Sequence, residues 1–207
     1  MGSSSAIPTK GTGDRAIAVL GAETAIGAAV VAGLTESGFA VVPVNDGEPS
    51  PPGTGVLIDA GPLREPHATG DLVALSAGDW MQAAEDPLRR SLHVLKAAHD
   101  LFRDGGGRIV VLLPSLVMTG APGVAAFAAA AEGYRSLAKA AARAWGAEGI
   151  AIQCVLVPTG TQRPGLQPPA LSTVPDLTPI LAALLDERLD ALTGQTIAAD
   201  GGVWMTS

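Results

Sequence analysis

The stretch Ile109–Gln153 reads IVVLLPSLVMTGAPGVAAFAAAAEGYRSLAKAAARAWGAEGIAIQ and decides the fold. It opens on an apolar run that predicts a buried strand, and continues through a loop that contains Pro114 and Pro122. An alanine-rich segment at about 124–147 predicts a long helix, and a second apolar run begins at Ile150. A strand, a helix and a strand in this order predict one unit of a parallel α/β sheet.

The composition predicts one domain over residues 14–207, preceded by a flexible tail at 1–13. Hydrophobic residues make up 47% of the 207 residues and charged residues 16%. These proportions suit a parallel sheet covered on both faces, together with a buried subunit interface. The net charge of −7, without any cluster of Lys and Arg, argues against a nucleic-acid partner or an anionic membrane surface.

Several other features exclude whole classes of protein. The uncharged segment Ile109–Ala131 is divided by Pro and Gly residues and therefore cannot form a membrane-spanning helix. Residues 1–13 lack the apolar core of a secretory signal, which leads us to expect a cytoplasmic protein.

The single Cys154 lies in an apolar run and predicts a buried structural thiol. His93 and His99 are six residues apart without a third ligand, so no metal site is expected.

The N-terminal part of the domain predicts a second unit of the sheet. Ala16–Leu20 is a short apolar run, and a turn and a helical pattern follow it as far as Ser37. Phe39–Val44 predicts the second strand. Further helices are expected from Asp79 to about Asp104 and over Leu177–Leu189.

Three motifs resemble those of the short-chain dehydrogenase/reductase (SDR) family. Gly21, Ile26 and Gly27 match the family's loop Thr-Gly-x-x-x-Gly-Ile-Gly, although Leu20 replaces the Thr and Ala25 the middle Gly. The other two motifs are the helix-to-strand marker at Gly149–Gln153 and the terminal Thr-Gly-Gln…Asp-Gly-Gly run within Leu192–Gly202. The resemblance extends over residues 16–205 and implies a Rossmann-like, doubly wound parallel sheet.

One unit of the family's fold is missing from this sequence. The family places a helix, a third strand and another helix between the segments that end at Asp46 and begin at Val56, where this chain has nine residues rich in Pro and Gly. Six strands are therefore expected. Pro43 supports this interpretation, because proline is tolerated in an edge strand, which the second strand then becomes.

The family's catalytic residues are not retained. Counting back from Gly149 places Phe127 at the position of the catalytic Tyr and Ala131 at that of the Lys four residues on. Tyr134 and Lys139 are five residues apart, about 140° around a helix, and do not replace the pair; Tyr134 is interpreted as an interface aromatic. Ser115 is a possible vestige of the catalytic Ser, and Pro87 stands where the family often has an Asn.

The resemblance implies only a vestigial dinucleotide site. Asn45 and Asp46 follow the second strand, where the family selects NAD or NADP, and would favour NAD; a surface turn is the alternative. Val56–Gly61 resembles the family's Asn-Asn-Ala-Gly motif. Within it, Asp59 either contacts a ligand or caps a turn, and the cap is favoured. No cofactor is expected unless the chain is an enzyme. The candidate cofactor residues are Gly21, Ile26, Gly27, Asn45, Asp46, Asp59 and Gly61.

These losses predict a pseudoenzyme of a bacterial, cytoplasmic pathway. The hypothesis is a non-catalytic SDR-like subunit that forms a hetero-oligomer with an active SDR ketoreductase or dehydrogenase. The expected contacts are the helices near 80–103 and 124–147, with Tyr134 and Trp145 as anchors, and the C-terminal strand at Val203–Met205. The alternatives are a divergent NAD(P)-dependent oxidoreductase of a small carbonyl or hydroxyl substrate, and a homo-oligomeric protein that binds a small ligand.

Overall fold

The computed structural model describes residues 15–45, 48–64, 71–118, 122–158 and 176–200. Its centre is a six-stranded parallel sheet in the order β2-β1-β3-β4-β5-β6. The strands are β1 (Ala16–Leu20), β2 (Val41–Val44), β3 (Thr54–Asp59), β4 (Gly107–Pro114), β5 (Ile150–Val157) and β6 (Thr196–Ala198).

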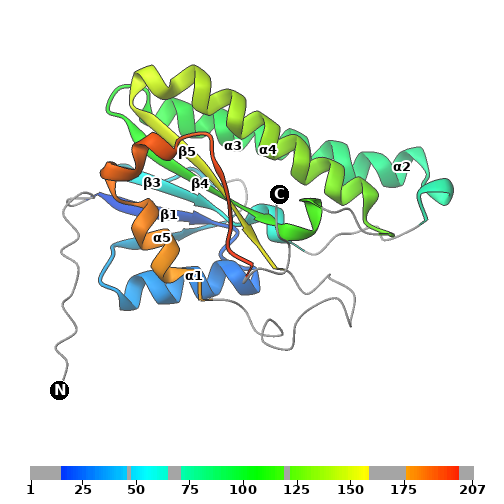
Figure 1. Cartoon of the computed structure of the whole chain (residues 1–207), viewed down its shortest axis with the longest axis horizontal. Helices are drawn as coiled ribbons and strands as arrows, with labels where there is room; N and C mark the ends of the chain where they lie inside the picture. Colours follow the sequence, from blue (N-terminus) through cyan, green and yellow to red (C-terminus); the bar gives the residue numbers. More distant parts are fainter. Residues whose placement is uncertain (1–14, 46–47, 65–70, 119–121, 159–175, 201–207) are drawn as a thin grey trace.

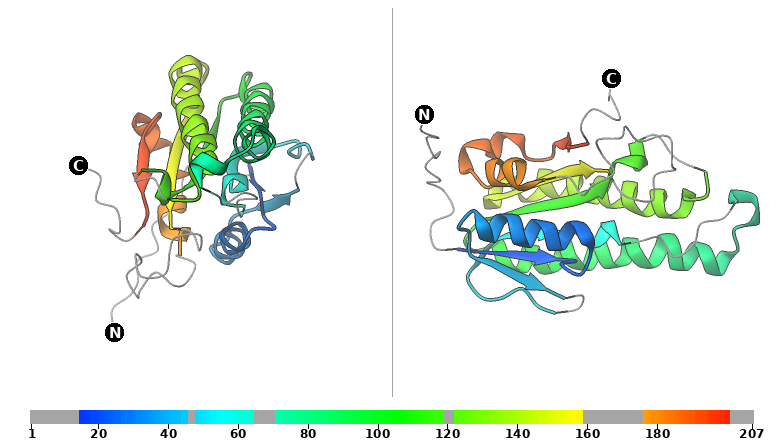
Figure 2. Two further views of the ribbon diagram at one scale, coloured as in Figure 1. Left: turned by 90° about the vertical axis from the view of Figure 1, so that its right-hand side faces the viewer. Right: turned by 90° about the horizontal axis from the view of Figure 1, so that it is seen from below.

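Helices cover both faces of this sheet, as Figures 1 and 2 show. On one face lie α1 (Ala25–Glu36) and α5 (Thr178–Leu184), and on the other α3 (Asp86–Phe102) and α4 (Ala125–Trp145). Short 3-10 turns are found at Gly61–Leu63, Leu72–Ala74, Ser115–Met118, Gly146–Glu148 and Glu187–Leu192. The predicted doubly wound, Rossmann-like sheet of six strands is confirmed.

The shortened segment also has the predicted effect on strand order. β2 is an edge strand that pairs with β1, with Pro43 opposite Val19. The chain then returns across β1 and enters β3 on its other side, after only the nine residues that separate Val44 from Thr54. β3 begins two residues earlier than the predicted Val56 and ends at Asp59, where the 3-10 turn Gly61–Leu63 takes over.

Alternation along the strands divides the core into two layers. Leu57 and Ala18 face α3 and α4, whereas Val19 and Ile58 face α1 and α5. Successive side chains of a strand point to opposite faces, and both faces are covered, so β3, β4 and β5 are buried almost throughout.

The helix expected from Asp79 to about Asp104 is divided. α2 (Ala77–Trp80) leads into a π-helical turn at Met81–Glu85, and α3 follows. Ser76 and Asp79 form a capping box at the start of α2. Pro87 lies in the first turn of α3, directly after the π turn, and has no N–H to donate to that preceding turn.

The helix predicted over Leu177–Leu189 is also shorter than expected. α5 ends at Leu184, and a separate 3-10 turn begins at Glu187. The Asp186 side chain caps this turn by accepting a hydrogen bond from the backbone N–H of Arg188. The predicted C-terminal contact strand at Val203–Met205 lies outside the described residues, as do Asp46 and the tail at 1–13.

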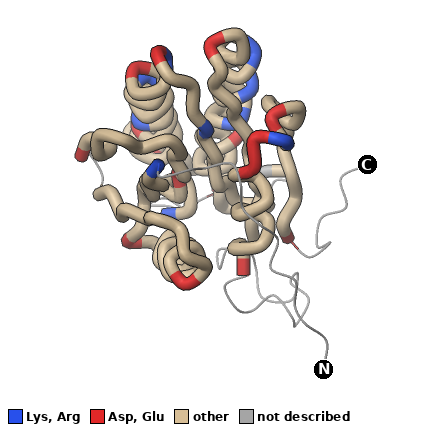
Figure 3. The backbone as a smooth tube through the Cα atoms, turned by 90° about the vertical axis from the view of Figure 1, so that its left-hand side faces the viewer, with Lys and Arg blue, Asp and Glu red and all other residues tan. Residues whose placement is uncertain are grey.

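Two further properties are the distribution of charged residues and the length and polarity of the helices. Figure 3 shows Lys and Arg interspersed with Asp and Glu over the described helices. No helix within the described ranges is both long and apolar enough to span a membrane.

Gly21 offers a test of how tightly the end of β1 packs on the end of β3. Its φ is +73°, and a Cβ would lie 2.6 Å from the backbone nitrogen of Gly61. Gly38 has a φ of +86° with nothing within 4 Å of its Cβ position, and is the matched control. We expect Gly38→Ala to lower the free energy of unfolding by roughly 1–2 kcal/mol through backbone strain alone. Gly21→Ala should lower it by roughly 3–5 kcal/mol, because backbone atoms must also move.

Urea unfolding of both variants, followed by circular dichroism, measures the difference. If both variants lose the same free energy of unfolding, the close approach of β1 and β3 at Gly21 contributes nothing to stability.

Candidate functional site

A cavity of about 510 Å³ opens beside the carboxyl ends of β1 and β3. Leu20 and Leu57 of these strands form part of its wall, and α3 and α4 close it from the same face of the sheet. The connection between β2 and β3 contributes Glu48, Pro49 and Ser50.

The cavity follows from the shortness of that connection. A crossover between parallel strands usually needs a dozen or more residues and carries a helix that covers the sheet. Here nine residues make the crossing, and the described ones among them form neither helix nor strand. The sheet face beside α3 therefore lacks a third covering helix, and the space is left open.

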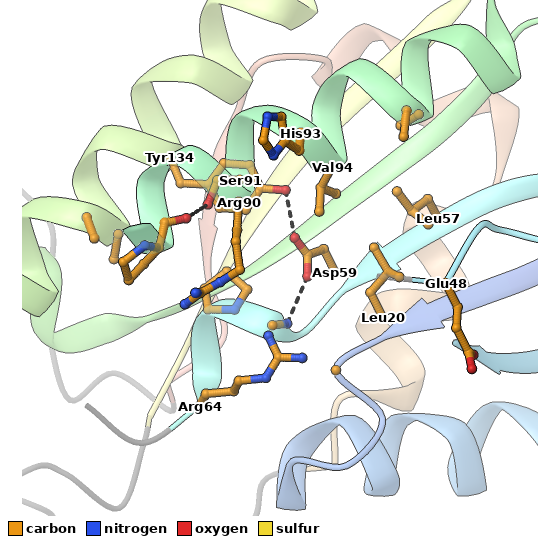
Figure 4. A pocket seen from close by; sticks show the side chains of 18 of the residues that line it. Leu20, Glu48, Leu57, Asp59, Arg64, Arg90, Ser91, His93, Val94 and Tyr134 are labelled. Carbon is orange, nitrogen blue, oxygen red and sulfur yellow. Dashed lines mark hydrogen bonds between the residues drawn. The ribbon is translucent and has the colours of Figure 1, made fainter. Parts of the chain in front are cut away.

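A buried hydrogen bond joins the two sides of the cavity. The Tyr134 hydroxyl on α4 donates to Asp59 Oδ2 at the end of β3, with an oxygen–oxygen distance of 2.7 Å (Figure 4). The backbone N–H of Gly61 donates to Asp59 Oδ1 at 2.8 Å, which is the turn cap favoured from the sequence. Tyr134 is 1% and Asp59 3% exposed. Burial, and then the charge of Asp59, raise the pKa of the Tyr134 phenol well above its ordinary value.

The interpretation of Tyr134 as an interface aromatic is therefore wrong. Its ring belongs to the core of its own chain, and too little of it is exposed to contact a partner. The other expected anchor, Trp145, is half-buried against the same core and lies 4.7 Å from the ring of His99 between ring centres. The role of Trp145 as an anchor for a partner stays a prediction.

The structure brings Phe127 and Ala131 into the cavity wall beside Tyr134. The three residues lie four and then three positions apart on α4, and hence on one face of that helix. Neither Phe127 nor Ala131 carries a group that can transfer a proton or bind an anion. Ser115 is fully buried at the carboxyl end of β4 and lies outside the cavity wall.

The loop between β1 and α1 keeps the geometry of a helix start. Thr24 caps α1, since its hydroxyl oxygen accepts a hydrogen bond from the Gly27 N–H at 2.9 Å. The Thr24 O–H in turn donates to the Gly21 carbonyl oxygen at 2.8 Å. Ile26 and Gly27 are buried in the first turn, whereas Ala25 is exposed at the helix N-terminus. Of the candidate cofactor residues, Gly21, Asp59 and Gly61 line the cavity.

Asn45 is engaged within its own turn. Its backbone N–H and its side-chain amide both donate to Glu48 Oε2, each at 3.2 Å. This geometry agrees with the alternative of a surface turn after β2. Its neighbour Asp46 lies outside the described residues.

The residues present do not fit a nicotinamide dinucleotide. The methyl group of Ala25 stands at the helix N-terminus, where a pyrophosphate would have to approach the backbone. Ala131, which the sequence assigns to the position of the family's Lys, presents a methyl group in the cavity wall. In the described part of the chain, no strand lies beyond β2 to flank an adenine.

The two helical histidines lie apart. His93 is exposed and lines the cavity, whereas His99 forms a contact of 2.8 Å with Glu148 at the far end of the helix pair. No group of three or more potential metal ligands occurs among the described residues. Burial raises the pKa of the Cys154 thiol to about 12, which keeps it protonated at neutral pH.

Comparison with known proteins supports the fold. No protein-family model matches the chain. Among the solved structures that resemble it is a short-chain type dehydrogenase/reductase from Mycobacterium ulcerans, with a TM-score of 0.75 and 18% sequence identity. The alignment covers 92% of this chain and 90% of that one. The chain therefore has an SDR-like fold, and at this identity the likeness extends to the fold alone.

The raised pKa of Tyr134 can be measured directly, because it is the single tyrosine of the chain. Below pH 10 the phenol is neutral in both the folded and the unfolded chain, so its full contribution to the stability of the folded chain is present. Above that pH the unfolded chain loses the proton first, and folding becomes less favourable as pH rises. We expect absorbance at 295 nm to show no tyrosinate at pH 10–11 while circular dichroism remains native, and then to rise together with unfolding.

The chain unfolded in urea is the control and should titrate near pH 10. Ionisation near pH 10 in the folded chain would contradict the burial of Tyr134 against Asp59.

Proposed function

We propose that this chain is a catalytically inactive, SDR-like subunit that associates with an active SDR ketoreductase or dehydrogenase. One observation carries the proposal. The single tyrosine hydroxyl of the chain is buried, donates to Asp59 and has a raised pKa. Phe127, which the sequence assigns to the position of the family's catalytic Tyr, lines the same cavity.

This arrangement opposes proton transfer at the cavity. A catalytic phenol works when its pKa is brought toward the working pH, usually by a nearby cation. Tyr134 has the opposite surroundings, because burial and a carboxylate both disfavour its ionised form. Lys139 is exposed and five positions further along α4, so it does not lie beside Tyr134 on the helix.

Exposed apolar side chains occur at Leu72, Val73, Met118 and Leu192, and on the α2–α3 segment, which we propose as the surface for association. Trp80, Met81 and Leu92 are exposed apolar side chains there, and Leu92 is 44% exposed. Exposed apolar side chains along one element are typical of a contact surface. The outer side of α4 is more polar, with an ion pair between Glu132 and Arg135.

The sequence suggested that the alanine-rich α4 contacts a partner, but its alanines contribute less to such a surface than expected. Most of those that are buried pack in the core beside the sheet of their own chain, and Ala126 packs against Ala83 and Ala84 of the π turn, so their small size shapes the interior. Gly133 allows α3 and α4 to approach closely, since a Cβ there would lie 2.9 Å from Leu88. The buried alanines are Ala126, Ala130, Ala131, Ala138, Ala141 and Ala142.

The test is co-expression with an intact SDR relative, followed by native mass spectrometry and NADPH oxidation at 340 nm. We expect a mixed oligomer in which activity requires the intact relative, and no oxidation of NADPH by this chain alone. Leu92→Glu should weaken the mixed oligomer at least about tenfold, because a carboxylate would be buried at the interface.

Val73→Glu is the matched control, since Val73 is 94% exposed and lies outside the α2–α3 segment. Exclusive homo-oligomers, or NADPH oxidation by the isolated chain, would refute the proposal. The proposed role places both subunits in the bacterial cytoplasm, as the sequence leads us to expect.

A further inference from the structure

We propose that the cavity between β1, β3, α3 and α4 binds a small amphipathic carboxylate. Its apolar body would lie against Leu20, Leu57 and Val94, and its carboxylate would lie at the end formed by Arg64 and Arg90. This site goes beyond the proposed function and does not rest on it, since the isolated chain contains every residue that forms it.

The size and chemistry of the cavity suit a small molecule. Its volume of about 510 Å³ lies within the 300–1,000 Å³ that is typical of ligand sites. Leu20, Leu57, Val94, Ala98 and Phe127 contribute apolar surface from three sides, namely the sheet, α3 and α4. Apolar walls with few polar groups are characteristic of sites that bury most of their ligand.

Charge is distributed unevenly around these walls. In Figure 4 the guanidinium groups of Arg64 and Arg90 lie on the same side of Asp59, and Glu48 lies on the other side. Arg64, which follows β3, pairs with Glu23 at 2.5 Å. Arg90, on α3, forms no hydrogen bond or ion pair with any described residue. One end of the cavity therefore offers a cation whose donors are available.

The acidic groups nearby are already engaged. Asp59 accepts hydrogen bonds from Tyr134 and Gly61, and Glu48 accepts from Asn45. Neither carboxylate neutralises Arg90, so an incoming anion would complete the hydrogen bonding at this end. A carboxylate matches the planar fork of a guanidinium group and can accept two parallel hydrogen bonds from it.

These features also determine which ligands should bind weakly. A neutral molecule of the same length would leave Arg90 without an acceptor, and a cation would be repelled by it. A dinucleotide meets the obstacles at Ala25 and Ala131 described above.

Isothermal titration calorimetry on the isolated chain tests the site with octanoate as the probe. Octan-1-ol and octylamine are the neutral and cationic counterparts of the same length. We expect octanoate to bind at least about tenfold more tightly than octan-1-ol, and octylamine not to bind. Arg90→Gln should weaken octanoate about tenfold. Arg89→Gln, an exposed neighbour that does not line the cavity, should leave binding unchanged.

A second variant tests the apolar end independently. Ala97 is exposed and lines the cavity from α3, so Ala97→Phe should fill the space without disturbing the core and abolish octanoate binding. Native circular dichroism confirms that each variant is folded.

Four results would overturn the proposal: no binding of octanoate to the unmodified chain, equal binding of octylamine, unchanged affinity in Arg90→Gln, or unchanged affinity in Ala97→Phe. Binding of NADH without binding of octanoate would do so as well. None of these results depends on whether the chain associates with an active subunit, so the two proposals fail separately.

Discussion

The return from β2 to β3 in nine residues is the constraint on which this structure depends. A connection so short can cross β1 but cannot form a helix over the sheet. It makes β2 the edge strand and leaves Leu20 and Leu57 facing a cavity instead of a packed helix. The same connection supplies Glu48, Pro49 and Ser50 to the cavity wall, so its shortness accounts for the space.

The hydrogen bond between Tyr134 and Asp59 stabilises what remains beside that space. It ties α4 to the end of β3 across the cavity wall, and the Gly61 N–H donates to the other oxygen of the carboxylate. A buried carboxylate without such donors would be costly. The hydroxyl of Tyr134, the single tyrosine of the chain, thus contributes to the attachment of α4 to the sheet.

Much of the framework could be predicted from the sequence because it depends on local patterns. The apolar runs of β4 and β5, the alanine-rich α4 and the edge position of Pro43 each follow from a few neighbouring residues. The contact between Asp59 and Tyr134 joins residues 75 positions apart, and no periodicity indicates it. The sequence shows that Tyr134 lies seven positions after Phe127 on the same helix face, but not what that face meets. The π turn at Met81–Glu85 and the end of α5 before Asp186 depend on capping and packing that override helical periodicity.

The edge strand β2 has a further consequence. The outer side of an edge strand presents unpaired backbone N–H and C=O groups. Another chain can pair a strand of its own with these groups. Pro43 interrupts that margin, because it has no N–H to offer and its ring fixes the local backbone. An exposed proline in a four-residue strand is a poor start for intermolecular β-pairing. The β2 edge of the sheet is thereby protected against pairing with the edge of another sheet.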